Sequence, residues 1–287
     1  MVTEPKRLRL TFAERAELTR NAVAKKVFHL MSAKESNLCA AIDETNPTKF
    51  MLLVEALGPH CAVIKTHIET LEGFSGRITV DLANLAREHN FLVFEDRKFA
   101  DVGQTVKNQY TKGTFHIIEW ADIVNAHAIP GPGMIEGLRD EVREYELLDD
   151  RGLLLLAQMS SAENLIDDDY TRKVVKLADR YDDFVIGFIG AGTANLPVLA
   201  EAAAPGFLIF APGVNLDGTG KPDHFGQQYE RPEDVIAAGA DLIVVGRDIY
   251  THAKPISRAK EYRKVAWDAY HRRIEQPKAR KTKVRAA

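Results

Sequence analysis

The sequence predicts a (β/α)8 TIM barrel with an additional N-terminal helix. Two observations lead to this fold class: short apolar runs alternate with segments of helical periodicity, and there are eight such runs. Alternating strands and helices imply parallel strands joined by crossover connections, and eight such units are enough to close a barrel. An open doubly wound sheet is the alternative. Because no Pro/Gly/Ser-rich linker divides the chain, we expect one domain over residues 1–287.

The first expected element is an amphipathic helix over Phe12–Met31, within an N-terminal helical extension at 1–33. The eight apolar runs predict strands at Leu38–Asp43, Cys61–His67, Phe91–Lys98, Ala121–His127, Leu153–Ser160, Phe184–Gly190, Gly206–Gly213 and Asp241–Arg247. Helical periodicity predicts helices that include Arg77–Glu88, Val102–His116, Met134–Leu147, Asp169–Arg180, Pro232–Ala238 and Ala259–Arg273. Residues 276–287 form a basic segment without periodicity, which is typical of a flexible tail.

The composition is that of an ordinary globular protein, with 45% hydrophobic and 28% charged residues and a net charge of −3. This balance gives no indication of nucleic acid or a membrane as a partner. No apolar run approaches the roughly 20 residues that a bilayer span needs, and the N-terminus lacks the apolar segment of a secretory signal. Cys39 and Cys61 lie inside apolar runs, which indicates buried free thiols and a cytoplasmic location.

Polar residues follow the apolar runs directly, at the strand ends where TIM barrels place their active sites. The candidates at these ends are Asp43, Lys65, His67, Asp96, Lys98, Asp101, Asn125, His127, Gln158, Ser160, Pro212, Gly213, Gly246 and Arg247. Their concentration predicts a polar cavity at the carboxyl end of the barrel.

The most informative strand end is Phe91–Asp101, where an apolar run gives way to Asp96, Lys98 and Asp101. Side chains two apart on a strand share a face, so Asp96 and Lys98 are expected to point to the same side. With Lys65 they form an array of alternating charge that is costly to desolvate, which favours a functional role. A structural ion-pair network is the alternative. Although histidines and carboxylates also lie at the strand ends, the two lysines would repel a divalent cation, so we expect no catalytic metal.

The end of the last strand predicts a phosphate site. Phosphates commonly bind around the loops after strands 7 and 8 of such barrels. Gly246 allows a close backbone approach there, and Arg247 provides a permanent, bidentate cation. The long connection Pro212–Arg231 is Gly-rich and polar, as is typical of a mobile lid over a ligand; a plain surface loop is the alternative.

Residues Asp96–Tyr110, DRKFADVGQTVKNQY, resemble the signature of orotidine 5′-phosphate decarboxylases of the fungal and animal-like type. The resemblance extends over nearly all of Phe12–Arg273. Hexulose-phosphate synthases share the DxKxxD core, but the later KTH, GQQY and VGR segments match the decarboxylases better. The resemblance implies conversion of orotidine 5′-monophosphate to UMP and CO2, the last step of pyrimidine nucleotide synthesis, without a cofactor. Because only about one helix precedes the barrel, we expect a monofunctional enzyme rather than a fusion to a phosphoribosyltransferase.

The resemblance also implies roles for individual residues. Lys98 would donate a proton to C6 of the pyrimidine, Asp96 would lie against the substrate carboxylate, and Lys65 and Asp101 would complete the array. In this family the second Asp of the motif comes from the neighbouring subunit, which implies a homodimer with shared sites in which Asp101 and Thr105 act across the interface.

Substrate contacts are implied for a further set of residues. Asp43, Lys65 and Thr105 would hold the ribose hydroxyls with His67 close by, Ser160 would bind the pyrimidine edge, and Pro212 would line the site. The 5′-phosphate would be held by Gln227, Tyr229, Gly246 and Arg247, with Gln227 bridging toward Ser160.

Two positions depart from the family pattern: Gln158 stands where Glu is frequent, and Asp248 stands where a small residue is common. They bear on the tuning of the site and remove none of its named groups. Two other functions remain as alternatives. One is a metal-dependent aldolase or epimerase that acts on a sugar phosphate, and the other is a non-catalytic nucleotide-binding barrel.

Overall fold

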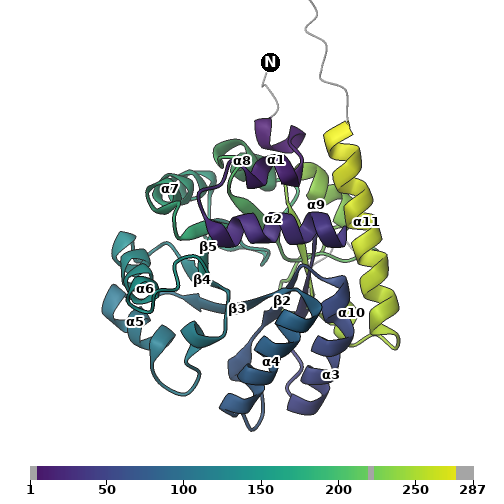
Figure 1. Cartoon of the computed structure of the whole chain (residues 1–287). Helices are drawn as coiled ribbons and strands as arrows, with labels where there is room; N and C mark the ends of the chain where they lie inside the picture. Colours follow the sequence, from purple (N-terminus) through teal and green to yellow (C-terminus); the bar gives the residue numbers. More distant parts are fainter. Residues whose placement is uncertain (1–4, 219–222, 276–287) are drawn as a thin grey trace, which may run out of the picture.

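The computed structural model describes residues 5–218 and 223–275. Eight parallel strands close into a barrel in sequence order, which confirms the predicted fold class (Figure 1). The strands are β1 Leu38–Ile42, β2 Val63–Thr66, β3 Leu92–Phe99, β4 Ile123–His127, β5 Gly152–Leu156, β6 Val185–Ile189, β7 Leu208–Ala211 and β8 Leu242–Val245. Closure is completed by β8 pairing with β1, where Cys39 lies opposite Val244.

Helices surround this barrel. The α-helices are α1 Phe12–Ala16, α2 Ala22–Lys34, α3 Pro47–Leu57, α4 Gly76–His89, α5 Gly103–Thr111, α6 Pro132–Glu144, α7 Asp168–Ala178, α8 Leu196–Ala202, α9 Pro232–Ala238, α10 Arg247–Tyr250 and α11 Pro255–Glu275. Five short 3-10 helices are η1 Lys6–Arg9, η2 Gly58–His60, η3 Ile68–Thr70, η4 Ile117–Glu119 and η5 Asp179–Tyr181. The long helix α11 runs beside α3, α9 and α10 (Figure 1).

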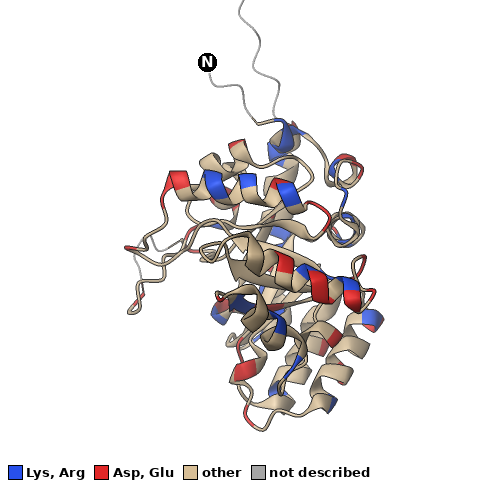
Figure 2. Ribbon diagram, turned by 90° about the vertical axis from the view of Figure 1, so that its left-hand side faces the viewer, with Lys and Arg blue, Asp and Glu red and all other residues tan. Residues whose placement is uncertain are grey.

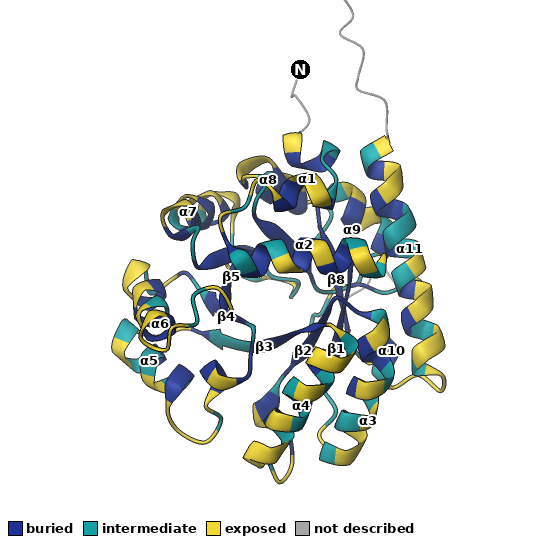
Figure 3. Cartoon of the chain, in the orientation of Figure 1, coloured by how far each residue is buried: buried dark blue, intermediate teal, exposed yellow. Residues whose placement is uncertain are grey.

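The core is the barrel itself together with the inward faces of the helices. Every residue of β5 and β6 is buried, because one face of each strand points into the barrel and the other packs under helices. Figure 3 shows this arrangement, with buried strands and helices that are exposed on their outer sides. Helices α5 and α6 approach closely at Gly103 and Gly137, where a Cβ on Gly137 would lie 2.7 Å from the Gly103 carbonyl oxygen.

The prediction of a single helix over Phe12–Met31 is wrong, because this segment forms the two helices α1 and α2. Two helices are present because the chain contains two helix starts. Thr11 and Glu14 form a capping box at α1, and the Asn21 side chain accepts a hydrogen bond from the Ala24 amide at the start of α2. Asn21 itself has an extended backbone, so the helix is interrupted before it.

Helix α2 lies across the end of the barrel at which the strands begin (Figure 1). At its start, Asn21 Nδ2 donates to the Asp183 carbonyl before β6, at 2.8 Å. At its end, Lys34 Nζ donates to the carbonyls of Gly58 and Cys61 before β2, both at 2.8 Å. This end of the barrel is therefore covered, which leaves the carboxyl ends of the strands for a ligand.

A buried ion cluster fixes the N-terminal segment to β8. Asp241, just before that strand, is fully buried and pairs with Arg7 Nη2 at 2.5 Å and with the guanidinium of Arg15. Arg273 of α11 lies at 3.5 Å from the same carboxylate. Burial would raise the pKa of Asp241, but Arg15 and Arg7 outweigh burial and lower it well below its usual value.

Several element ends differ from those expected. Strand β5 stops at Leu156 rather than Ser160, and α5 stops at Thr111 rather than His116, where Gly113 has a φ of +72°. The expected flexible tail at 276–287 and residues 219–222 of the predicted lid lie outside the described residues.

No helix in the described ranges is long and apolar enough to cross a membrane. On the face that Figure 2 draws, positive and negative residues are interspersed along the helices.

Candidate active site

A cavity of about 340 Å³ opens at the carboxyl ends of the strands. Most of the residues predicted from the strand ends and from the family resemblance line it. They are Asp43, Lys65, Asp96, Lys98, Asn125, Gln158, Ser160, Pro212, Gly213, Gln227, Tyr229, Gly246 and Arg247. The predicted residues His67, Asp101, Thr105 and His127 are not among the lining residues. Apolar side chains, among them Phe94, Met159 and Ile189, complete the lining. The cavity thus combines a charged end, a polar end and an apolar wall, as a site for an amphipathic small molecule requires.

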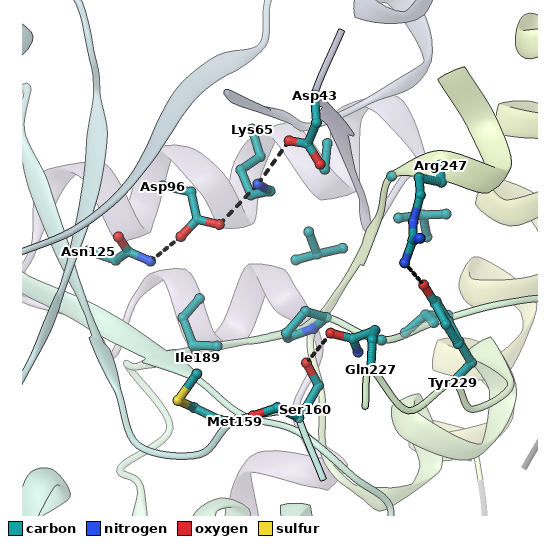
Figure 4. Close-up of a pocket in the computed structure, with 18 of the residues that line it drawn as sticks. Asp43, Lys65, Asp96, Asn125, Met159, Ser160, Ile189, Gln227, Tyr229 and Arg247 are labelled. Carbon is teal, nitrogen blue, oxygen red and sulfur yellow. Dashed lines mark hydrogen bonds and ion pairs between the residues drawn. The ribbon is translucent and has the colours of Figure 1, made fainter. Parts of the chain in front are cut away.

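The charged end is organised around Asp96. Lys65 Nζ lies 2.9 Å from Asp96 Oδ2 and 3.4 Å from Asp43 Oδ1, so this buried ammonium bridges two carboxylates (Figure 4). Lys98 Nζ lies 2.6 Å from Asp96 Oδ1. The sequence-predicted array of alternating charges is therefore present for the three residues Lys65, Asp96 and Lys98.

A bulge in strand β3, rather than the regular alternation of side chains along a strand, brings Asp96 and Lys98 together. The register of β3 against β4 shifts between Glu95 and Phe99, and Lys98 has a φ of +50°, which is rare and costly for a residue with a side chain. Asn125 of β4 holds this bulge, because its Oδ1 accepts from the Lys98 amide at 2.7 Å and its Nδ2 donates to Asp96 Oδ1 at 2.6 Å. Asn125 was a strand-end candidate without a predicted role. In the structure this buried side chain positions the Lys98 backbone and the Asp96 carboxylate.

The array remains charged although it is largely buried. Burial would raise the pKa of Asp96, but Lys65, His67 and Lys98 outweigh burial and lower it well below the usual range. Burial would lower the pKa of Lys65, but Asp96 and Asp43 raise it above its ordinary value. The site therefore carries fixed opposite charges before any ligand binds.

His67 faces Asp96 rather than the cavity. It is absent from the residues that line the cavity, and its Nε2 lies 3.2 Å from Asp96 Oδ2 while its Nδ1 lies 3.4 Å from Glu69. Burial would lower the pKa of His67, but the hydrogen bonds with Asp96 and Glu69 raise it to about 9. His67 is thus a third cation beside Asp96.

The neighbouring carboxyl group, Glu95, lies on the other face of β3 and is fully buried. The Thr66 hydroxyl donates to Glu95 Oε2 at 2.6 Å, and the Ile68 amide donates to both carboxyl oxygens at 3.2 Å. Burial raises the pKa of Glu95 to about 8, with a further contribution from nearby Glu69. This shift favours the neutral carboxyl form of Glu95 at neutral pH. The sequence placed it in the same charged run as Asp96, with no sign of this difference.

The opposite end of the cavity contains the predicted phosphate residues. Ser160 Oγ donates to Gln227 Oε1 at 3.1 Å, and an Arg247 Nη2 group donates to the Tyr229 hydroxyl (Figure 4). Gly246 is the N-cap of α10, which begins at Arg247. Gln227 and Ser160 are thus in contact, and the guanidinium and phenol that would hold an anion are adjacent.

The two residues that depart from the family pattern have partners within the fold. Gln158 is buried, donates from Nε2 to the Asn195 carbonyl at 2.7 Å and accepts from the Ala191 amide at 3.0 Å. Asp248 accepts from Arg258 Nη2 at 2.8 Å and from the hydroxyl of buried Tyr262. Both side chains therefore brace the cavity wall.

Asp101 and Thr105 stand apart from the cavity within one chain. Asp101 is exposed and its Oδ1 accepts a hydrogen bond from the adjacent Val102 amide at 2.7 Å. Thr105 lies in the first turn of α5, and neither residue lines the cavity. Among the described residues, no group of three or more His, Cys, Asp or Glu side chains is arranged to hold a metal ion.

The chain is similar in sequence to a family of known proteins. The profile of the orotidine 5′-phosphate decarboxylase / HUMPS family matches residues 36–262. The orotidine 5′-phosphate decarboxylase of Pachysolen tannophilus is 44% identical over 271 residues, which cover 94% of this chain and 98% of the relative. That of Eremothecium gossypii is 45% identical over 266 residues, covering 92% of this chain and 97% of the relative.

Solved structures show the same barrel. Orotidine 5′-monophosphate decarboxylase from Methanocaldococcus jannaschii, complexed with inhibitor BMP, gives a TM-score of 0.64 at 19% identity and covers 80% of this chain and 97% of that one. The Pyrococcus horikoshii orotidine 5′-phosphate decarboxylase gives 0.61 at 18% identity, covering 81% and 99%. At such low identity, these likenesses bear on the fold alone.

Proposed function

The chain belongs to the orotidine 5′-phosphate decarboxylase / HUMPS family, and from this premise we propose its reaction and the residues that perform it. It catalyses the decarboxylation of orotidine 5′-monophosphate to UMP and CO2, the last step of de novo pyrimidine nucleotide synthesis. The observation that carries this assignment is the Lys65–Asp96–Lys98 array, placed in a cavity whose other end presents Arg247 and Tyr229.

Lys98 is the proton donor to C6 of the pyrimidine. Loss of CO2 leaves an electron pair on C6 in an orbital that the ring cannot delocalise, so a nearby cation and a proton source must stabilise it. The Lys98 ammonium supplies both, since it can face the developing negative charge and then transfer a proton to C6. Its contact with Asp96 at 2.6 Å and the bulge fixed by Asn125 support this role, because they hold the ammonium in place before substrate binds.

Asp96 lies against the substrate carboxylate. Because Lys65, His67 and Lys98 keep Asp96 ionised, a bound carboxylate would meet a fixed negative charge, and departure of CO2 would relieve that repulsion. The same cations would attract the anionic substrate as a whole and stabilise the charge that forms on C6. Lys65 and Asp43 then hold the ribose hydroxyls at the adjacent wall, with His67 acting behind Asp96.

The polar end of the cavity binds the 5′-phosphate. Arg247, Tyr229, Gly246 and Gln227 provide a guanidinium, a phenol, a backbone approach and an amide in one region of the lining. Ser160 binds the pyrimidine edge and connects to this region through Gln227. Binding energy from the phosphate, remote from C6, can then organise the charged end for the reaction.

A second copy of the chain completes each site with Asp101 and Thr105. The surface around Asp101 supports this, because apolar side chains are exposed there: Val102 is 63% and Ile129 is 75% exposed. These residues lie on neighbouring segments, since Gly103 packs against the backbone of Gly133. A partner that covers them would bury an apolar patch and bring its own Asp101 toward the neighbouring cavity.

A cytoplasmic location accompanies this assignment. Cys39 and Cys61 are both free and buried, which a reducing compartment permits. Fractionation of cells that express a tagged full-length chain would test it, and recovery of the protein in an organelle fraction would contradict it.

The purified chain should convert orotidine 5′-monophosphate to equimolar UMP and CO2 in the presence of excess chelator. A metal-dependent sugar-phosphate aldolase or epimerase would instead act on pentose or hexulose phosphates and lose activity with the chelator. A non-catalytic nucleotide-binding barrel would bind UMP and release no CO2. Either of those results would overturn the assignment.

A further inference from the structure

An acidic side chain that no sequence motif indicated lies beside the phosphate end of the cavity, in contact with two residues of its lining. Asp223, in the connection between β7 and α9, places Oδ2 at 2.5 Å from Arg247 Nη2. The Tyr229 hydroxyl lies 3.5 Å from the same oxygen. Two of the side chains proposed to hold the phosphate, Arg247 and Tyr229, are therefore in contact with a carboxylate of the protein itself.

The backbone holds Asp223 firmly in this position. Its Oδ1 accepts from the amides of Phe225 and Gln227, each at 3.0 Å. Its own amide donates to the Gln227 carbonyl at 2.8 Å, and Gly226 donates back to the Asp223 carbonyl at 2.9 Å. One carboxyl oxygen thus closes the turn that carries Gln227, while the other is directed at Arg247.

We propose that Asp223 occupies Arg247 in place of the substrate phosphate and so determines how strongly the site prefers phosphorylated ligands. This inference rests on the proposed phosphate role of Arg247. A carboxylate and a phosphate dianion repel each other, and both seek the same Nη2 group, so a phosphate must displace Asp223 or share the guanidinium at a cost. When the product leaves, the Asp223 carboxylate again forms the ion pair with the Arg247 guanidinium.

The charge states fit this competition. Hydrogen bonds from Arg247 and the Gln227 amide lower the pKa of Asp223, so it is ionised at neutral pH. The Arg247 side chain is 59% exposed and that of Asp223 is 22% exposed, so the pair is reachable by a ligand from solvent. Such exposed pairs are weak, so the competition modulates phosphate binding rather than preventing it.

The test compares Asp223→Asn with wild type. Asparagine keeps the carbonyl oxygen that accepts from Phe225 and Gln227, so the turn is retained while the negative charge is lost. Titration calorimetry with UMP should show binding roughly two- to fivefold tighter in the variant, the range expected for an exposed ion pair. Uridine, which has no phosphate, should bind equally to both proteins, and the difference for UMP should shrink at high salt.

Two further variants separate direct competition from a general charge effect. Asp217→Asn removes one negative charge from the same connection, at a residue that forms no ion pair with Arg247 within the described ranges, and it should leave UMP affinity unchanged. In an Arg247→Ala background, Asp223→Asn should no longer tighten UMP binding, because the contested group is absent.

The outcomes distinguish this inference from the proposed phosphate site. If Arg247→Ala lowers UMP affinity but Asp223→Asn leaves it unchanged or weakens it, Asp223 merely orients Arg247 and the competition is refuted. If wild type binds UMP and uridine equally and Arg247→Ala has no effect, the phosphate site lies elsewhere and both proposals fail. Tighter UMP binding confined to Asp223→Asn with intact Arg247 supports the competition.

Discussion

The pKa values of two adjacent carboxyl groups, Glu95 and Asp96, are shifted in opposite directions because strand β3 places them on opposite faces. Burial, together with nearby Glu69, raises the pKa of Glu95 to about 8, although the hydrogen bonds from Thr66 and the Ile68 amide act in the opposite direction. Burial also acts on Asp96, but the surrounding cations lower its pKa well below the usual range. Pairs of titratable groups that are driven apart in this way mark acid–base and electrostatic sites. Here the ionised member faces the cavity and the neutral member supports the barrel wall.

Glu95 should make the stability of the protein depend on pH between about 4.5 and 8. Its pKa is higher in the folded than in the unfolded state, so folding binds a proton and stability falls as pH rises through this window. Glu95→Gln should remove this contribution, so the variant should gain stability relative to wild type between pH 5 and pH 8. The gain is at most a few kcal/mol, since one pKa unit corresponds to about 1.4 kcal/mol. Urea unfolding at both pH values measures it, and a difference independent of pH would contradict the assigned protonation.

The N-terminal segment and α11 are joined to the barrel by a buried ion cluster around Asp241 as well as by apolar packing. Three arginines from separate elements converge on Asp241 at the start of β8, and all four side chains are buried. Such a cluster is stable only while the carboxylate is present, because each guanidinium would otherwise be a buried charge without its counterion. The cluster thus fixes the covered end of the barrel and leaves the other end for chemistry.

Asp241→Asn should therefore lower the free energy of unfolding by about 3–5 kcal/mol, the range for removing one partner of a buried ion pair. Asp182→Asn is the matched control, since Asp182 forms an exposed pair with Arg20 at 3.5 Å. That variant should change stability by less than about 1 kcal/mol. Chemical denaturation measures the free energy of unfolding of both variants. Equally small losses in Asp241→Asn and Asp182→Asn would show that the buried cluster adds no net stability.

Shared active sites would make the dimer, rather than the single chain, the catalytic unit. A mixture of Asp96→Ala and Asp101→Ala chains should then regain activity, because a mixed dimer contains one site with both carboxylates intact. Random exchange of a symmetric dimer gives about a quarter of wild-type activity in an equimolar mixture. A steady-state assay after subunit exchange measures this.

The control for that experiment mixes Asp96→Ala with Lys98→Ala. Both residues belong to the same subunit's part of the site, so each site of a mixed dimer lacks one of them and no activity should return. Sedimentation of wild type gives the oligomeric state independently. A monomer, or equal recovery in both mixtures, would contradict shared sites.

The sequence predicted the parts of the molecule that depend on local pattern. Apolar runs located all eight strands, and the polar residues behind them identified most of the polar side chains that line the cavity. What it missed depends on contacts between distant segments. Nothing in the run EDRK distinguishes protonated Glu95 from ionised Asp96, because their partners Thr66 and Lys65 come from β2. Asp223 was missed for the same reason, since its partner Arg247 lies beyond α9 and β8.

The proposed role of Lys98 as proton donor, beside Asp96, is tested by Lys98→Ala. The experiment measures kcat, from the loss of orotidine 5′-monophosphate absorbance, together with UMP affinity. We predict that kcat falls by at least about 100-fold, the lower range for a positioned general acid, while UMP affinity changes only severalfold because the phosphate end is intact. A near-normal kcat in this variant would exclude Lys98 as the proton donor.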